Sequence, residues 1–244
     1  MAGAIIHRMS LRQTVATPEG KRRYVRTLFA TIADRYDLIT VILSYGRDRA
    51  WKRRLVRMAG AHAGTRALDL ATGTGDIAYL LHDAGARVVG LDVTARMIEL
   101  ATAKRDVKHR PRFIVGDMTA LPFPSGCFDL VTTGYGLRNV PDLGVALDEI
   151  ARVLTPCGQL LSLDFDRPSG ALLRTAYLTY LSIVGGALGW MLHGDPDTYR
   201  YIPASIRVYP GAAAVASQMR ARGFAAAVHH RVLGGFMAIH HART

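Results

Sequence analysis

A short glycine-rich loop carries the strongest chemical signal in the sequence. Gly73-Thr74-Gly75 follows an apolar run that contains Asp69, and Asp76 follows the loop directly. Glycines let a ligand approach the backbone, and a helix that starts after such a loop presents free N–H groups. Nicotinamide and flavin enzymes use the same device. The two flanking acids would repel a pyrophosphate but attract a sulfonium and an amino group, so they favour a sulfonium nucleoside.

Two more acids follow the next two predicted strands. Asp92 ends the strand after the loop, where a carboxylate can accept both ribose hydroxyls. Asp117, followed by Met118, ends the third strand, where it can accept from an adenine amino group. Each acid also has an ordinary structural interpretation. Asp92 can be a helix N-cap, a role that Thr94 can fill instead or as well, and Asp117 can be a turn residue. Ligands at three successive strand ends would nevertheless line one crevice at the carboxyl edge of a parallel sheet.

The elements that position these residues alternate between short apolar runs and helical stretches from Arg66 onward. This alternation predicts a parallel sheet with right-handed crossovers, and hence an α/β, Rossmann-like domain. The predicted strands are residues 67–71, 87–91, Arg112–Val115, 128–133 and 159–165, and the predicted helices between them are 76–84, 95–105 and 143–154. A helix at 212–222 and a hairpin of strands 225–232 and 235–240, joined at Gly234-Gly235, complete the chain.

Composition divides the chain into a tail and one domain. Residues 1–20 are predicted to form a flexible tail, and their apolar patch is too short for the core of a secretion signal. Residues 21–244 form a single domain with four parts: N-terminal helices at 21–60, a cofactor-binding core at 66–168, an apolar helical segment at 169–210, and a C-terminal helix and hairpin at 211–244. In the first part Trp51, Leu55 and Met58 share one helix face.

Residues 175–192 carry no charged side chain. A membrane-spanning helix needs about 20 predominantly apolar residues, and this run is marginally short and contains Gly185, Gly186 and Gly189. We therefore expect a buried or interfacial helix pair rather than a span. Such a surface can serve a membrane or a second copy of the chain.

The charge balance is strongly basic, with 31 Lys and Arg against 19 Asp and Glu and a net charge of +12. Basic residues cluster in 21–26 and 47–57, which fits either a solvated helix face or an anionic surface nearby. A surface that binds RNA would interleave basic and aromatic residues, and beyond the early cluster the sequence lacks that pattern. We expect no nucleic-acid partner.

Cysteine and histidine usage predicts neither disulfides nor a metal site. Cys127 and Cys157 are the two cysteines, and the late histidines show no metal-ligand spacing: His229, His230, His240 and His241. This composition fits a reducing, cytoplasmic setting.

Several blocks resemble the ubiquinone/menaquinone biosynthesis C-methyltransferase family, which includes demethylmenaquinone methyltransferases. The resemblance covers roughly residue 21 to the C-terminus. Its blocks are Ile32-Ala-Asp-Arg-Tyr-Asp37, Leu43-Ser-Tyr-Gly46, Trp51-Lys-Arg53, the glycine loop, Gly134-Tyr-Gly-Leu-Arg-Asn-Val140, Asp197-Thr-Tyr-Arg-Tyr-Ile202, Ser205-Ile-Arg207 and Pro210. It implies the class I fold of methyltransferases that use S-adenosylmethionine (SAM), with seven strands and an antiparallel last strand. It also implies SAM as methyl donor and a prenylated quinol as acceptor.

The same resemblance assigns cofactor contacts. Four residues match cofactor-contacting positions of the family: Thr74, Asp92, Asp117 and Met118. Gly134 matches a fifth, often Ser in relatives, where only backbone atoms would contribute. Two other positions depart from the family: Thr40 stands where relatives often carry Asn, and Cys157 replaces a Gly in a Lys-Pro-Gly-Gly turn.

Methylation of a quinol carbon requires alignment of the reactants and stabilisation of a phenolate. Arg138 and Asn139 follow the fourth strand at the mouth of the same crevice. Arginine is a poor base because its pKa exceeds about 12. We predict that Arg138 stabilises the phenolate or a water that acts as base, and that Asn139 orients that water or a quinol hydroxyl. The alternative for Arg138 is an ion pair with Asp142 or Asp148.

Other candidate residues lie outside the strand ends. Tyr36, beside Asp37, is predicted to cap the cofactor or the quinol ring. Tyr199 and Tyr201 are predicted to line the substrate side, although tyrosines at such spacings are ordinarily core or rim residues. His193 is a candidate base because imidazole titrates near pH 6.5, its alternative being a hydrogen-bonded surface group.

A prenyl tail resides in a bilayer, so we expect peripheral contact at the inner face of the cell membrane, with a homodimer as an alternative use of the apolar segment. Three rival functions remain: methylation of another small molecule or RNA, nicotinamide-dependent oxidoreduction, which the acids around the loop disfavour, and non-catalytic nucleoside binding on the same fold.

Overall fold

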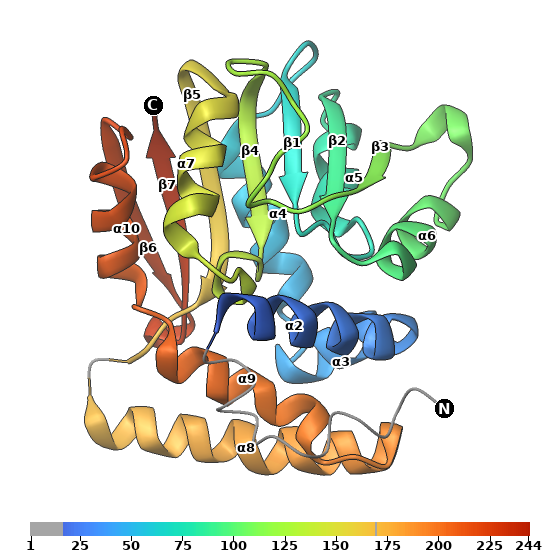
Figure 1. The fold of residues 1–244 in the computed structure, drawn as a ribbon, viewed down its shortest axis with the longest axis vertical. Coiled ribbons are helices and arrows are strands. Elements are labelled where there is room, and N and C mark those ends of the chain that lie inside the picture. The colour runs from blue at the N-terminus through green and yellow to red at the C-terminus, as the bar shows by residue number, and fades with distance from the viewer. Residues whose placement is uncertain (1–16, 169) are drawn as a thin grey trace.

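In this computed structural model, which describes residues 17–168 and 170–244, one seven-stranded sheet forms the centre of the molecule (Figure 1). Its order is β3-β2-β1-β4-β5-β7-β6. The strands are β1 (Arg66–Leu70), β2 (Arg87–Asp92), β3 (Arg112–Val115), β4 (Phe128–Gly134), β5 (Leu154–Phe165), β6 (Ala226–Val232) and β7 (Met237–Arg243). The first five strands are parallel, and β7 runs antiparallel to both β5 and β6. The predicted α/β fold with an antiparallel last strand is confirmed.

Helices cover both faces of the sheet because the strands carry apolar side chains on both faces. Leu68 and Leu70 of β1 pack with α7 (Leu143–Val153) and α10 (Ala212–Arg220). The opposite face, with Ala67, packs with α4 (Asp48–Ala59) and α5 (Asp76–Asp83), while α6 (Ala95–Ala103) lies near β2 and β3. The strand order reverses between β1 and β4, which places a crevice at the carboxyl ends of these strands.

Two N-terminal helices lie across those strand ends: α2 (Pro18–Ile32) and, after a 3-10 turn at Ala33–Arg35, α3 (Tyr36–Leu43) (Figure 1). The predicted tail is wrong for residues 18–20. Thr17 caps α2 by accepting from the Gly20 N–H, and Pro18 starts the helix, where proline needs no N–H partner. The prediction for residues 1–16, including the short apolar patch, lies outside the described residues.

The apolar segment forms one uninterrupted helix, α8 (Ala171–His193), so the expected helix pair within 175–192 is wrong. Its partner is the next helix, α9 (Asp197–Val208), which folds back along it. Small residues permit this close approach. A Cβ on Gly185 would lie 3.2 Å from the Tyr199 carbonyl oxygen of α9, and a Cβ on Gly189 would lie 2.5 Å from the Asp195 carbonyl oxygen in the turn before α9. Among the described residues α8 is the one helix long and apolar enough to cross a membrane, with a mean hydropathy of 1.3.

The predicted element boundaries hold to within a few residues, with one larger difference at β5. This strand begins at Leu154 rather than at residue 159, because the turn through Cys157 stays within the strand. Cys157 has a φ of 64°, a left-handed backbone conformation that favours glycine. The predicted late hairpin is confirmed as β6 and β7, joined by Leu233–Gly235.

Candidate active site

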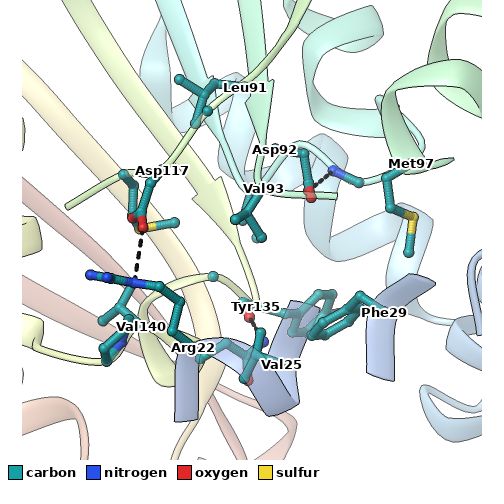
Figure 2. A pocket seen from close by; sticks show the side chains of 18 of the residues that line it. Arg22, Val25, Phe29, Leu91, Asp92, Val93, Met97, Asp117, Tyr135 and Val140 are labelled. Carbon is teal, nitrogen blue, oxygen red and sulfur yellow. Dashed lines mark hydrogen bonds and ion pairs between the residues drawn. The ribbon is translucent and has the colours of Figure 1, made fainter. Parts of the chain in front are cut away.

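A cavity opens between the carboxyl ends of β1 to β4 and helix α2; we call it the strand-end cavity (Figure 2). Its free volume is about 700 Å³, within the range of small-molecule sites. Predicted residues from several elements line it together: Tyr36, Gly73, Asp92, Asp117, Met118, Gly134 and Asn139. Residues far apart in the sequence therefore meet in one site, as the strand-end pattern predicted.

Asp92 ties the end of β2 to the glycine loop. One carboxylate oxygen accepts from the Gly73 N–H at 2.9 Å and the other accepts from the Thr94 N–H at 2.9 Å. Thr94 is the N-cap residue of α6, but its own side chain makes no capping hydrogen bond. Burial raises the pKa of Asp92 above its ordinary value. The acid thus lines the cavity as a buried acceptor and is not simply a helix cap.

Asp117 combines its two predicted roles. It accepts from the backbone N–H and the hydroxyl of Thr119, which is the turn role, and it also lines the strand-end cavity. Arg22 of α2 pairs with it at 3.2 Å, so this ion pair fastens α2 over the cavity (Figure 2). Arg22 was missed by the sequence analysis, because nothing along the chain relates it to Asp117.

The glycine loop adopts the backbone that its glycines predict. Gly73 and Gly75 have φ values of 55° and 86°, where side chains are rarely tolerated. Gly73 lines the strand-end cavity, whereas Gly75 lies outside its lining and caps the N-terminus of α5. A small recess beside the strand-end cavity is lined by Asp69 and Thr74. The Thr74 hydroxyl donates to Asp37 at 2.6 Å, which links the loop to α3.

Asp69 is buried in the middle of β1. It accepts from the hydroxyls of Thr72 and Thr132 at 2.6 Å and 2.7 Å. Burial raises its pKa to about 6, although these hydrogen bonds oppose the shift. Gly134 faces the same recess, and a Cβ there would lie 2.8 Å from the Ile77 Cδ1 atom. Glycine at residue 134 therefore avoids a clash with Ile77 and also leaves the backbone open to the recess.

A second cavity lies between α2, α3, α9 and the sheet; we call it the apolar cavity. Its lining includes Leu28, Ile39, Trp51, Tyr177 and Ile202, and its free volume is about 810 Å³ including the part open to solvent. Phe29, Tyr36 and Tyr135 line both cavities, which therefore meet at these three rings. Burial raises the pKa of the Tyr36 hydroxyl to about 12.

Arg138 belongs to the wall of the apolar cavity. Its guanidinium pairs with buried Asp164 at 3.3 Å, donates to the Ser205 hydroxyl at 2.5 Å, and lies 4.9 Å from the centre of the Phe165 ring. The alternative pairing with Asp142 or Asp148 is wrong. Asp142 caps α7, and Asp148 pairs with Arg222.

Asn139 lines the strand-end cavity with both amide atoms engaged. Its Nδ2 donates to the Tyr135 carbonyl at 2.8 Å, and its Oδ1 accepts from the Tyr201 hydroxyl at 3.2 Å. Asn139 therefore joins the strand-end cavity to Tyr201, a lining residue of the apolar cavity.

Tyr199 also lines the apolar cavity, as predicted for the substrate side. His193 stands behind it, outside the cavity lining, with its Nε2 atom 2.8 Å from the Tyr199 hydroxyl. Burial lowers the pKa of His193 below its ordinary value. The structure therefore links His193 to the cavity lining through Tyr199.

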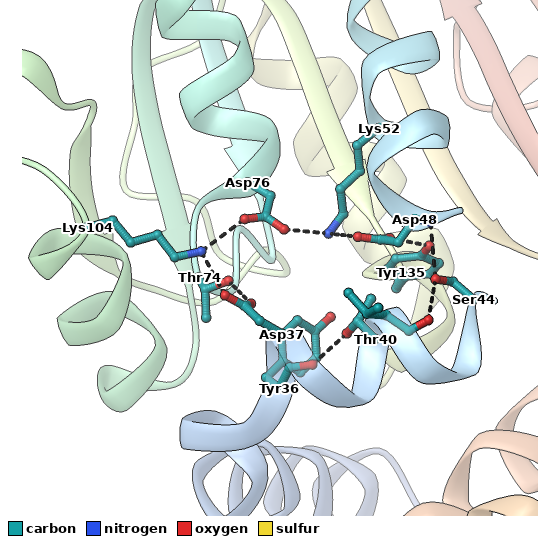
Figure 3. Close-up of polar contacts among 11 residues, drawn as sticks. Tyr36, Asp37, Thr40, Ser44, Asp48, Lys52, Thr74, Asp76, Lys104 and Tyr135 are labelled. Carbon is teal, nitrogen blue, oxygen red and sulfur yellow. Dashed lines mark hydrogen bonds and ion pairs between the residues drawn. The ribbon is translucent and has the colours of Figure 1, made fainter. Parts of the chain in front are cut away.

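The sequence analysis also missed a polar chain that starts at Tyr135 and continues through Asp48, Lys52 and Asp76 to Lys104 (Figure 3). Asp48 and Lys52 are four residues apart, a spacing that pairs charges on one helix face, and this was the available signal. Their contact with Tyr135 depends on tertiary structure.

Known proteins share both the sequence and the fold. A model of the ubiE/COQ5 methyltransferase family matches residues 17–244. A demethylmenaquinone methyltransferase of Thermus thermophilus is 42% identical over 217 residues, covering 87% of this chain and 98% of the relative. A ubiquinone/menaquinone biosynthesis C-methyltransferase UbiE of Azotobacter vinelandii is 37% identical over 233 residues, 92% of each chain.

A solved structure with the same fold is a SAM-dependent methyltransferase, possible histamine N-methyltransferase, from Thermotoga maritima. It matches with a TM-score of 0.65 at 18% identity, covering 90% of this chain and 99% of that one. At this identity the likeness supports the fold alone. The family match and the two relatives cover most of the sequence, and they agree with the blocks from which the resemblance was inferred. The chain belongs to the ubiE/COQ5 methyltransferase family.

Proposed function

We propose that this enzyme transfers a methyl group from SAM to a ring carbon of a prenylated quinol. One observation carries the proposal: a cavity lined by strand-end acids meets an apolar, aromatic cavity at Phe29, Tyr36 and Tyr135. Relatives named for demethylmenaquinone and for ubiquinone/menaquinone biosynthesis support the quinol as acceptor. The alternative of a methyltransferase acting on RNA has no comparable support.

The strand-end cavity suits SAM in the chemistry of its lining. Asp92 would accept from the ribose hydroxyls, and Asp117 with the Met118 backbone would hold the adenine ring. Asp69 and the glycine loop would hold the charged methionine part, where a buried carboxylate favours cations. When bound, SAM supplies the methyl group on a sulfonium, and the cavity junction is where that group must meet an acceptor.

Arg138 would act on the acceptor. Its guanidinium is fixed by Asp164, Ser205 and the Phe165 ring, and it forms part of the wall of the apolar cavity. A buried, preorganised cation stabilises negative charge that develops on a quinol oxygen. It does so without acting as a base. Tyr199 and Tyr201 would pack against the quinol from the α9 side.

The apolar tail would leave the cavity toward α3 and α8. Exposed large apolar side chains gather on these helices and on Tyr45, which follows α3: Leu38, Val41, Ile42, Tyr45, Leu172, Leu173, Ile183, Trp190 and Met191. Tyr45 stacks on Tyr180 at 5.9 Å, which joins the two helices. We call this the α3–α8 apolar face. With exposed Arg47 and Arg174 nearby in the chain, it suits peripheral contact with an anionic membrane at the cytoplasmic side.

Two experiments test the function and the membrane contact separately. Expression in a strain that lacks quinone methylation should restore the methylated quinone in its lipid extract, as measured by mass spectrometry. An unchanged quinone pool from folded, expressed protein would contradict the substrate assignment. Flotation should recover more of the protein with anionic vesicles than with neutral ones. Equal recovery would show that electrostatic attraction does not contribute to membrane binding. A stable dimer that does not bind vesicles would assign the α3–α8 apolar face to a subunit interface.

A further inference from the structure

Tyr135 occupies a constrained position at the junction of the two cavities. Its φ of 62° lies in the left-handed region that non-glycine residues rarely adopt. The backbone is held on both sides: the Tyr135 N–H donates to the Leu163 carbonyl at 2.7 Å, and its carbonyl accepts from Asn139. This strained backbone places the ring between both cavities and aims its hydroxyl away from the sheet toward α4 (Figure 3).

The hydroxyl starts a continuous polar chain that reaches the surface. It donates to Asp48 at 2.7 Å; Asp48 pairs with Lys52 at 2.6 Å, and Lys52 pairs with Asp76 at 2.9 Å. The side chains of Asp48 and Lys52 are 4% and 7% exposed, whereas that of Asp76 is 35% exposed. The chain therefore leads from the interior junction to solvent.

Other tyrosines of the apolar cavity have different partners. Tyr201 donates to the neutral amide of Asn139, and Tyr199 contacts His193 away from the junction. Among the lining residues of the apolar cavity that the structure describes, Tyr135 is the one whose hydroxyl donates to a carboxylate. Because its own proton is directed at Asp48, the Tyr135 oxygen is left to accept a hydrogen bond.

We propose that Tyr135 accepts the hydrogen bond of the substrate hydroxyl and relays the proton released in methylation to Asp48, whose carboxylate is held in place by Lys52. The proposal rests on the quinol as acceptor. It adds a proton acceptor to the stabilising cation that Arg138 provides.

The proton balance defines the step. The quinol O–H bond breaks, its proton passes to the Tyr135 oxygen, and the Tyr135 proton passes to Asp48. The ring carbon then forms its bond to the methyl group while the bond between that methyl group and the donor sulfur breaks. The proton on this ring carbon moves to the quinol oxygen, which restores the aromatic ring. One proton remains on Asp48. It passes to water when the products leave.

The charges around Asp48 suit this transfer. The titratable groups around Tyr135, Asp48 and Lys52 are Tyr36 of α3, Asp69 of β1, Asp76 of α5 and Asp164 of β5. Burial and the Asp48 charge raise the pKa of Tyr135 well above its ordinary value, so the phenol passes a proton on without remaining ionised. Burial lowers the pKa of Lys52, but Asp48 and Asp76 outweigh this effect and raise it, so Lys52 keeps its proton and stays a cation beside Asp48.

The test compares Tyr135→Phe with the parent enzyme from pH 6.5 to 9, using a short-tailed quinol. We expect kcat to fall about 10- to 100-fold, the lower part of the range for general-base assistance. The affinity for S-adenosylhomocysteine, from calorimetry, should stay within about twofold. The ratio of parent to variant kcat should shrink as pH rises, because hydroxide replaces the missing acceptor. Asp48→Asn should give the same pH-dependent loss.

Tyr79→Phe is the matched control, since it removes a buried tyrosine hydroxyl that donates to Ala101 at 2.7 Å, away from both cavities. It should keep the parental kcat and pH profile. A Tyr135→Phe enzyme with parental kcat would overturn the proposal, and so would a loss that is the same at every pH, which indicates a structural role. Parent protein that binds the cofactor product but methylates no quinol would instead refute the proposed substrate.

Discussion

At the scale of single residues, the two carboxylates that flank the glycine loop have pKa values shifted in opposite directions. Burial raises the pKa of Asp69 to about 6. Burial also acts on Asp76, but Lys52 and Lys104 outweigh it and lower the pKa to about 2. Asp76 therefore stabilises the fold above its ordinary pKa of 3.8 and loses this contribution as pH falls toward 2, whereas ionised Asp69 destabilises it. A buried charge that destabilises the free protein can be retained at a binding site because it contributes to ligand affinity.

Replacing Asp69 by Asn should therefore stabilise the free enzyme and impair cofactor binding. Between pH 4 and 6 the native protein holds a proton on Asp69 more tightly than the unfolded chain, so the parent loses stability as pH rises through this window. The shift corresponds to about 3 kcal/mol at most. Urea unfolding should show Asp69→Asn gaining about 1–3 kcal/mol over the parent from pH 4 to pH 7. A stability difference that does not change with pH would contradict the buried charge.

Asp92 should carry much of the cofactor affinity. Asp92→Asn keeps the shape and one acceptor oxygen for Gly73 or Thr94, but it removes the charge and one acceptor from the strand-end cavity. Hydrogen bonds to charged groups contribute about 1.5–3 kcal/mol, so the Kd for S-adenosylhomocysteine should rise about 10- to 150-fold by calorimetry. Asp83→Asn, which removes a surface partner of Arg105, is the control. Equal affinities for the Asp92 variant and the parent would move the nucleoside elsewhere.

Arg138 should affect turnover and leave cofactor affinity intact. Arg138→Lys keeps a cation near Asp164 but loses the planar fork that also reaches Ser205. We expect kcat to fall about 10- to 100-fold with S-adenosylhomocysteine affinity within about twofold. Arg138→Ala would leave buried Asp164 without its charged partner, with only the backbone N–H groups of residues 138 and 165 as donors, and is expected to unfold more easily. A Lys variant that loses only cofactor affinity would exclude the role in phenolate stabilisation.

At the scale of elements, the sheet could be predicted from sequence and the helices over its edge only in part. Apolar runs predict β1 to β5: the central strands are largely buried, and the edge strand β3 still carries half-buried Phe113 and Ile114. The continuity of α8 could not be predicted, since its glycines weaken an isolated helix, and their use appears only in the packing against α9. Likewise, sequence spacing could not predict that Arg138 pairs with Asp164 or that Tyr135 donates to Asp48. Both contacts join residues far apart in the chain and depend on how strands and helices pack.

The α3–α8 apolar face predicts how surface changes affect vesicle binding. Ile183 on α8 is 67% exposed, and Val107, on the 3-10 turn between α6 and β3, is 75% exposed. Ile183→Ser should weaken binding to anionic vesicles several-fold and raise the KM for a vesicle-borne quinol, because less apolar surface enters the interface. Val107→Ser should leave both values unchanged. Equal effects from the two substitutions would show that the contact is not specific to this face.

At the scale of the whole molecule, the fold brings three features together: cofactor contacts at the strand ends, an apolar cavity between the helices, and the Asp48 carboxylate of α4 beside Tyr135. The positive charge adds a general attraction to anionic surfaces. Sequence blocks gave the family and most of the cofactor-side residues. The acceptor side was less predictable, because its residues come from α2, α3, α9, β5 and the segment after β4, and they meet only after folding.

The most direct measurement follows an isotope-labelled methyl group. The purified enzyme is incubated with SAM labelled in its methyl group and a reduced, short-tailed quinol that lacks the ring methyl group, and the products are analysed by fragmentation mass spectrometry. The account predicts one labelled methyl group on a ring carbon. Label on a quinol oxygen, or an unlabelled quinol beside enzyme that binds S-adenosylhomocysteine, would contradict it.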